Sequence, residues 1–217
     1  WQDAGARVLT PPLVATVGAQ VGRIAALEQA IAPQWQQART PPAAAPKLPV
    51  EPHTVGLAPG EAPVDPAGWE VADIVLVDAR DGAALSPEAQ TALLDHVASG
   101  ATLIVAGAES SGLPDQLLAA RPSTATTASV VTSDGEAEVA ALQLDPLAGA
   151  ESLALAGAPG APAFARPCGL GRLVTIGLDL TGSAARDALT EADWKTIAGA
   201  RAVGGALRWC TPGAQPD

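Results

Sequence analysis

A strand, a capped helix and a second strand follow one another in one stretch of the chain, and this run constrains the fold most. Ala72 to Asp78 reads ADIVLVD and Thr102 to Gly107 reads TLIVAG, two short apolar runs typical of buried strands. Between them, Ser86 is placed to cap a helix that Pro87 begins and that Gly100 ends. Buried strands that alternate with helices predict a parallel sheet covered by helices.

The composition is consistent with one aliphatic core. Of the 217 residues, 48% are hydrophobic but only 3% are aromatic, so Leu, Val, Ile and Ala must form that core. This length suits one α/β domain with extensions, or two small domains. We expect an N-terminal extension over residues 1–12, a single α/β domain over 13–210 with a Pro/Ala-rich insertion at about 40–68, and a C-terminal tail over 211–217.

The charge balance excludes two classes of partner. Lys and Arg number 12 against 23 Asp and Glu, which gives a formal net charge of -11, and the basic residues are scattered singly. Such a surface repels nucleic acid and anionic lipid. No run approaches the roughly 20 apolar residues that span a bilayer, so we expect no direct membrane span within these residues.

The rest of the chain predicts shorter elements. Further strands are expected at 13–18, near 50–55, and at 123–132, 138–144 and 153–156. Helices are expected at 21–31, 113–120 and 192–209. Residues 164–168 and 173–180 flank Gly169-Leu170-Gly171 and predict a late β-hairpin with a glycine turn.

Three pieces in this order resemble the class I glutamine amidotransferase-like fold, in the degenerate form found in bacterial membrane-associated and exported proteins. They are the strand–helix–strand stretch from Trp69 to Gly107, the sequence GLGRLVTIGLDLT at 169–181, and the terminal helix that carries Trp194. The resemblance implies a flavodoxin-like α/β fold: a three-layer sandwich with a mostly parallel central sheet, a late β-hairpin and a C-terminal helix.

The chain departs from the catalytic pattern of that family. Active members place a cysteine in a tight G-x-C-x-G turn after the strand that corresponds to 102–106, and a His-x-Glu pair activates it. Here the turn reads Gly107-Ala108-Glu109, and the loop after Leu180 contains no histidine. The resemblance therefore implies a pseudoenzyme without a cofactor: a non-catalytic interaction or scaffold domain. Its expected partners are other protein subunits in a membrane-associated, extracytoplasmic assembly.

A rival hypothesis places chemistry at the ends of the strands. Ligands bind at the carboxyl ends of parallel strands, which makes Glu109, Ser110, Ser111 and Asp78 the candidate ligand-binding residues. They would serve a small-ligand receptor or a hydrolase, although a serine nucleophile needs a base that has no evident candidate here. The alternative for Ser110 or Ser111 is to cap a following helix. A fragment of a larger enzyme, and a cytoplasmic location, remain further alternatives.

The aspartates at the strand ends allow one more interpretation. Asp78, Asp81 and Asp179 all fall there, and converging carboxylates could hold Mg²⁺ or Ca²⁺. We favour solvated loop aspartates and predict no metal site. The two histidines, His53 and His96, do not make one either, and His96 is expected on the partly exposed side of its helix.

The cysteine and tryptophan residues allow two further predictions. Cys168 and Cys210 could form a disulfide in an exported protein, or stay as two buried free thiols. Trp69, Trp194 and Trp209 are expected to anchor loops and the last helix to the core. Trp1 and Trp35 are the two that we expect to pack against a partner chain.

Overall fold

The computed structural model describes residues 13–18, 26–27, 30, 53–133 and 135–199. Its strands are β1 Leu13–Val17, β2 His53–Leu57, β3 Ala72–Asp78, β4 Thr102–Ala106, β5 Ala120–Thr132, β6 Gly135–Pro146, β7 Glu151–Ser152, β8 Ala163–Cys168 and β9 Gly171–Ile176. Its helices are α2 Ala79–Gly82, α3 Pro87–Ser99, α4 Ser183–Ala188 and α5 Glu191–Ala198, with 3₁₀ turns η1 Pro59–Glu61, η2 Pro66–Trp69 and η3 Asp115–Leu117.

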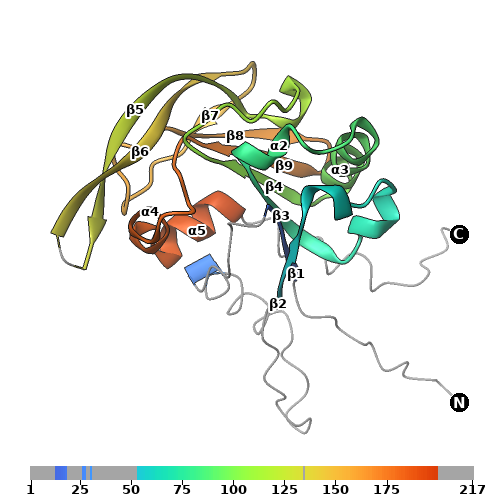
Figure 1. The fold of residues 1–217 in the computed structure, drawn as a ribbon, viewed down its shortest axis with the longest axis horizontal. Coiled ribbons are helices and arrows are strands. Elements are labelled where there is room, and N and C mark those ends of the chain that lie inside the picture. The colour runs from blue at the N-terminus through green and yellow to red at the C-terminus, as the bar shows by residue number, and fades with distance from the viewer. Residues whose placement is uncertain (1–12, 19–25, 28–29, 31–52, 134, 200–217) are drawn as a thin grey trace, which may run out of the picture.

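Seven of the described strands form one sheet in the order β2-β1-β3-β4-β9-β8-β7. The first five run parallel, and the late hairpin adds β8 and β7 in antiparallel orientation. β5 and β6 pair separately as a long two-stranded ribbon that arches away from the sheet (Figure 1). The prediction of an α/β fold with a mostly parallel sheet is confirmed.

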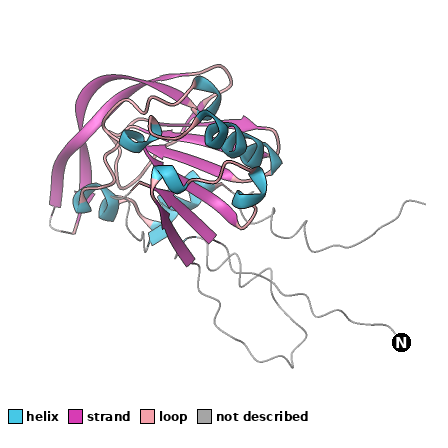
Figure 2. Ribbon diagram, turned by 45° about the vertical axis from the view of Figure 1, so that its right-hand side comes forward, coloured by secondary structure: helices cyan, strands magenta, loops and turns pink. Residues whose placement is uncertain are grey.

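The core lies on both faces of this sheet. Ile74 of β3 packs in the same apolar cluster as Trp194 of α5. Its neighbour Val75 packs in a second cluster with Leu93 of α3. Because successive side chains of a strand point to opposite faces, α3 covers one face and α5 the other. Figure 2 shows these helices on either side of the strands.

Helix α3 forms as its sequence predicts. The Ser86 hydroxyl oxygen accepts a hydrogen bond from the Ala89 amide at 3.1 Å, and Pro87 occupies the first turn. Gly100 follows the last helical residue. These signals are local in sequence, which is why they could be read without the fold. At 13 residues α3 is the longest described helix, and none of the described helices could cross a membrane.

The expectation that His96 is exposed is wrong. Its side chain is only 9% exposed, and its Nε2 lies 2.7 Å from the carbonyl oxygen of Ala72. A carbonyl can only accept, so Nε2 carries the proton and donates it. Burial lowers the pKa of His96, and the bond to Ala72 opposes that shift in part. His96 therefore joins α3 to the amino end of β3.

The late hairpin is confirmed, with a shorter second arm. Gly169 and Leu170 connect β8 to β9, and the φ of Gly169 is +59°, a conformation that favours glycine at a tight turn. The predicted strand ran to Leu180, but β9 ends at Ile176. Beyond it, Leu178 bridges to Ala141 of the ribbon, so the chain has already left the sheet.

Other predicted elements differ from the structure. Residues 113–119 contain only the short turn η3, and β5 begins at Ala120. Residues 153–156 form no strand, and β7 lies just before them. The last described helix ends at Ala198, with Gly199 at a φ of +74°, so one helix over 192–209 is wrong. The strand expected near 50–55 corresponds to β2, while most of the predicted helix at 21–31 lies outside the described residues.

The ribbon is longer than expected. Strands were predicted at 123–132 and 138–144, and β5 and β6 extend these to 13 and 12 residues. Its inner side contributes Ala128, Val130 and Ala141 to the cluster around α5. Trp69 and Trp194 are buried as predicted, whereas Trp1, Trp35 and Trp209 lie outside the described residues.

Candidate functional site

The carboxyl ends of four parallel strands meet at one edge of the sheet. Their register aligns Val17 of β1 with Val77 of β3, and Asp78 with Ala106 of β4 and Ile176 of β9. From β1 the chain goes first to β2 on one side and then to β3 on the other. Such a reversal of strand order is where open parallel sheets bind ligands. We call the polar residues at this edge the strand-end site: Asp78, Arg80, Glu109, Asp179 and Thr181.

Asp78 is the buried member of the strand-end site. Its side chain is 3% exposed, and Oδ1 accepts a hydrogen bond from the Arg80 amide at 3.0 Å, which caps the short helix α2. Oδ2 is buried and has no partner among the described residues. Burial raises the pKa of Asp78, against the opposing effect of Arg80. The expectation that Asp78 is a solvated loop residue is therefore wrong.

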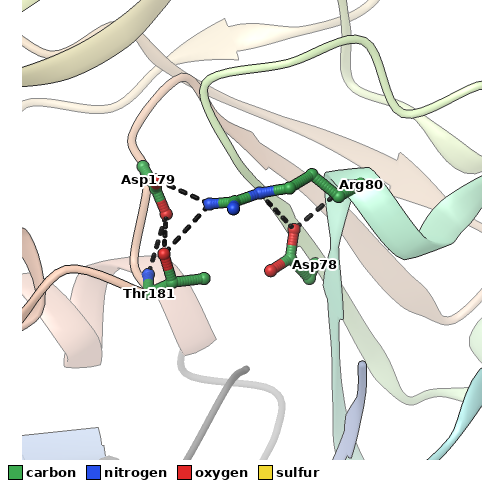
Figure 3. A network of polar contacts seen from close by, with 4 residues as sticks. All are labelled: Asp78, Arg80, Asp179 and Thr181. Atoms are coloured by element: carbon green, nitrogen blue, oxygen red, sulfur yellow. Dashed lines mark hydrogen bonds and ion pairs between the residues drawn. The ribbon is translucent and has the colours of Figure 1, made fainter. Parts of the chain in front are cut away.

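Arg80 joins the end of β3 to the segment after β9, as Figure 3 shows. Its Nη2 donates to Asp179 Oδ2 at 2.6 Å and to Thr181 Oγ1 at 3.0 Å, and its Nε lies 3.8 Å from Asp78 Oδ1. Thr181 in turn donates its amide and its hydroxyl to Asp179 Oδ1, at 2.9 and 2.6 Å. The guanidinium thus lies between two carboxylates in a closed network.

The charges in this network stabilise one another. Burial works against ionisation of Asp179, but the hydrogen bonds from Thr181 and the charge of Arg80 outweigh it and lower the pKa of Asp179. Burial also disfavours the charged form of Arg80, yet Asp179, Asp78 and the more distant Glu109 raise its pKa. At neutral pH the site therefore holds the Arg80 guanidinium paired with the ionised carboxylate of Asp179.

The loop after β4 brings Glu109 to this edge, followed by two serines. Glu109 and Ser110 are exposed. Ser111 is 1% exposed, and its hydroxyl oxygen accepts a hydrogen bond from the Leu113 amide at 3.2 Å. It stabilises a loop, not the helix that the sequence predicted. The histidine whose side chain is described, His96, binds Ala72 at the opposite end of β3.

Sequence reasoning missed Arg80, Thr181 and Gly18. The first two could have been found from their positions in the sequence. Arg80 follows the end of β3 by two residues, and Thr181 follows the strand-end residue Asp179 by two. Gly18 follows β1 with a φ of +118°, and a Cβ there would lie 3.1 Å from the Asp78 Cβ and overlap Asp81 Oδ2. The close approach of β1 to β3 is a tertiary feature that gave no local signal.

The remaining predictions for chemistry concern metal ligands and thiols. Within the described ranges, no three His, Cys, Asp or Glu side chains are grouped so that they could hold a metal ion. The carboxylates of Asp78 and Asp179 already share the Arg80 guanidinium. Cys168 lies at the opposite end of the sheet, paired with Gly171 at the start of β9, and burial raises the pKa of its half-buried thiol. A disulfide to Cys210 stays a prediction, because Cys210 lies outside the described residues.

Comparisons with known proteins assign no family. No family model matches the chain, and no curated protein does. Among solved structures, a β-galactosidase from Rahnella sp. R3 is 12% identical with a TM-score of 0.45, over 92% of this chain and 31% of that one. A cytoplasmic protein from Salmonella typhimurium is 8% identical with a TM-score of 0.48, over 80% of this chain and 89% of that one.

A ThuA-like protein from Bacteroides uniformis is 6% identical with a TM-score of 0.40, over 97% of this chain and 95% of that one. The chain spans 35% of an exo-β-1,4-mannosidase from Opitutaceae bacterium strain TAV5 and 28% of a further β-galactosidase. At these identities and TM-scores, the likenesses assign neither a family nor an activity to this chain.

Proposed function

We propose that this chain is a non-catalytic interaction domain built on a three-layer, amidotransferase-like α/β scaffold. The observation that carries the proposal is the closed network at the strand-end site. The edge of the sheet where active members of that family hold their nucleophile is spanned here by Arg80, bound to Asp179 and Thr181. The packing of α3 on one face and α5 on the other supports the three-layer assignment.

The geometry gives little support to hydrolysis. A serine hydrolase needs a hydroxyl within hydrogen-bond reach of a base. The Ser111 hydroxyl is buried and accepts from Leu113. Ser110 is exposed and makes no hydrogen bond to a base among the described residues. The turn Gly107-Ala108-Glu109 contains no cysteine. A guanidinium held by carboxylates also cannot accept a proton from a nucleophile.

The partners that we propose are other protein subunits of an extracytoplasmic, membrane-associated assembly. The net charge of -11 makes nucleic acid and anionic lipid poor partners. An oxidising compartment would allow a bridge between Cys168 and Cys210. Mass analysis of the protein purified from its native source without reductant tests this: a mass lower by two hydrogens supports an oxidising compartment, and two alkylatable thiols oppose it.

Hydrolase substrates and a serine-reactive inhibitor test whether the chain is non-catalytic. We expect the folded chain to show no turnover of activated esters or of aryl glycosides above the buffer rate. A fluorophosphonate should label neither Ser110 nor Ser111. Arg80→Met and Ser110→Ala serve as matched variants, since a true activity at this edge would fall in at least one of them. Turnover that depends on either residue would overturn the proposal.

One observation favours a second function, the binding of a small ligand. Asp78 Oδ2 is buried without a described partner at the strand-order reversal, so it could accept a hydrogen bond from an amine or hydroxyl of a metabolite. A ligand of this kind should raise the midpoint of thermal unfolding of the wild type and leave that of Asp78→Ala unchanged. Asp95→Ala, on the exposed side of α3, is the control. An equal rise in both variants would place the ligand elsewhere.

A further inference from the structure

The β5–β6 ribbon has one covered edge and one edge that is partly open. On β6, the Leu142 amide donates to Gly177 at 2.9 Å, and the Ala140 carbonyl accepts from the Asp179 amide at 3.3 Å. Both bonds point away from β5, so the segment after β9 covers this edge of the ribbon. Ala140 and Leu142 stand opposite Thr127 and Ala125 of β5.

This register fixes the direction of the groups on β5. In an antiparallel pair, opposite residues point their amide and carbonyl groups either toward each other or both outward. Ala140 and Leu142 point outward, so their partners Thr127 and Ala125 also point outward, on the other edge. The Val131 amide confirms the alternation, because it donates outward to Gly157 at 2.9 Å.

The outward edge of β5 is closed at one end and open at the other. Gly157 covers it at Val131, and Gly160 approaches it at Ser129, where a Cβ on the glycine would lie 3.5 Å from the Ser129 amide. At Thr127 no backbone partner is present among the described residues. The Thr127 carbonyl has only the neighbouring Thr126 hydroxyl, at 3.4 Å. Unpaired strand edges of this kind are sites for the addition of another strand.

A groove lies beside this open edge. Its volume is about 600 Å³, and Thr127 and Gln143 of the ribbon line it together with residues 152–155 and 159–164. The lining holds no charged side chain, and it includes the half-buried apolar residues Leu153 and Phe164. A peptide strand in the groove could pair with the backbone of β5 and place alternate side chains on these apolar residues.

The net charge of the chain favours a basic occupant. Near the groove, exposed Asp145 stands opposite Arg121 of β5, and the charge of exposed Glu151 acts on Arg172, so neither sign dominates there. The whole chain carries a net charge of -11. Two copies of the chain would repel each other, whereas a segment rich in Lys or Arg would be attracted.

We propose that the groove binds an extended, positively charged peptide segment of a partner protein, which adds a strand to β5 at residues 125–127. This inference rests on the proposed function and gives the interaction domain a binding site. The main-chain hydrogen bonds would come from Thr127 and Ala125, and the apolar contacts from Leu153 and Phe164.

A proline at Thr127 tests the strand addition directly. Thr127→Pro removes an amide that points away from β6, so the β5–β6 pairing keeps its hydrogen bonds. Thr127→Val is the matched control, because it keeps the amide and the size of the side chain. Both variants are checked for the wild-type circular dichroism spectrum and a cooperative thermal transition. Ala125→Pro, at the other outward position, provides a second variant if Thr127→Pro does not fold.

The binding probe is a random peptide library displayed on phage, panned on the wild-type chain at physiological ionic strength. We expect enrichment of peptides that carry Lys or Arg between apolar residues. Synthetic versions should bind Thr127→Pro about tenfold or more weakly than wild type, and bind Thr127→Val like wild type. Peptides that bind all three proteins equally would overturn the site and leave the interaction function standing. Enrichment of acidic peptides, or a dimer that Thr127→Pro abolishes, would overturn the proposed occupant.

Hydrolytic turnover at the strand-end site is a separate outcome. It would overturn the non-catalytic function, and peptide binding at β5 would still be tested by the Thr127 variants.

Discussion

Asp73 is a carboxylate in an unfavourable position. It lies in β3, where burial raises its pKa to about 6, although the Leu13 backbone opposes that shift with a hydrogen bond. The unfolded chain ionises this group near pH 3.8, so the folded state binds more protons between that pH and 6. The free energy of unfolding should therefore fall as pH rises through this window.

We predict that Asp73→Asn stabilises the protein at pH 7 by on the order of 2–3 kcal/mol, because the amide carries no charge and still accepts from Leu13. The gain should vanish at about pH 3 and below, where Asp73 is neutral in both states. Urea unfolding at the two pH values measures it. Asp95→Asn, on the exposed side of α3, should change little at either pH. A gain that is equal at both pH values would show that the charge of Asp73 is not its cause.

Individual residues were predictable from the sequence where their partners are near in the chain. Ser86, Pro87 and Gly100 bound a helix through contacts within a few residues, and the structure places all three as expected. His96 and Asp78 were not predictable in this way. His96 is buried because it contacts Ala72, 24 positions earlier, and Asp78 because β1 and β4 enclose β3.

At the scale of elements, one carboxylate holds α5 in place. Asp193 is 2% exposed and accepts four hydrogen bonds. Two come from the amide and hydroxyl of Thr190, at 2.9 and 2.8 Å, and cap the helix. The other two come from the amides of Ala156 and Gly157, at 2.6 and 3.1 Å, and join the helix to the loop before β8. Burial opposes its ionisation, but these bonds outweigh burial and lower the pKa of Asp193.

We predict that Asp193→Asn lowers the free energy of unfolding by about 2–4 kcal/mol, since the amide accepts fewer and weaker hydrogen bonds and leaves buried donors unpaired. The stabilisation by Asp193 is present above the ordinary aspartate pKa and is lost as pH falls through the lowered folded value. Urea unfolding at pH 7 measures the loss, and amide exchange should accelerate at Ala156 and Gly157. The control is Glu191→Gln, which removes an exposed pair with Lys195 worth about 0–1 kcal/mol. Unchanged exchange at Ala156 would contradict the link between helix and loop.

The elements that were predicted wrongly have no clear hydrophobic periodicity of their own. Residues 113–120 seemed helical, yet the Ala119 and Ala120 amides donate to the Thr175 hydroxyl of β9, at 2.9 and 3.4 Å. That contact spans more than 50 positions and holds the chain extended. The ribbon was predicted as two shorter strands. β5 begins earlier, at Ala120, and β6 extends beyond both of its predicted ends, because the pairing of the two strands defines their length.

At the scale of the whole molecule, the edge at which the site lies was predictable, but the contacts between its residues were not. The strand–helix–strand pattern predicted where Asp78 and Glu109 would converge, because parallel strands end at one edge. The network itself depends on the segment after β9, which brings Asp179 and Thr181 to Arg80 from about a hundred positions away. No spacing within the sequence encodes that contact.

The surplus of acidic groups should make the stability of the whole chain depend on salt. The 23 Asp and Glu outnumber the 12 Lys and Arg, and at pH 7 their mutual repulsion favours expansion of the chain. Exposed ion pairs such as Lys195–Glu191 act in the opposite direction, but a pair of this kind contributes only about 0–1 kcal/mol. Repulsion over the whole surface should therefore prevail.

We predict that the midpoint of thermal unfolding at pH 7 rises as sodium chloride is increased from low to physiological concentration, because salt screens the repulsion. Near the isoelectric point of about 4.5 the net charge disappears, and the same salt should leave the midpoint unchanged or lower it by weakening the remaining ion pairs. Scanning calorimetry at the two pH values measures both effects. A midpoint that falls with salt at pH 7 would mean that specific ion pairs such as Arg80–Asp179 outweigh the net charge. In that case the midpoint of Arg80→Met would fall less with salt than that of wild type. If the prediction holds, the midpoint of Arg80→Met rises with salt at least as much as that of wild type, because the variant carries one more net negative charge.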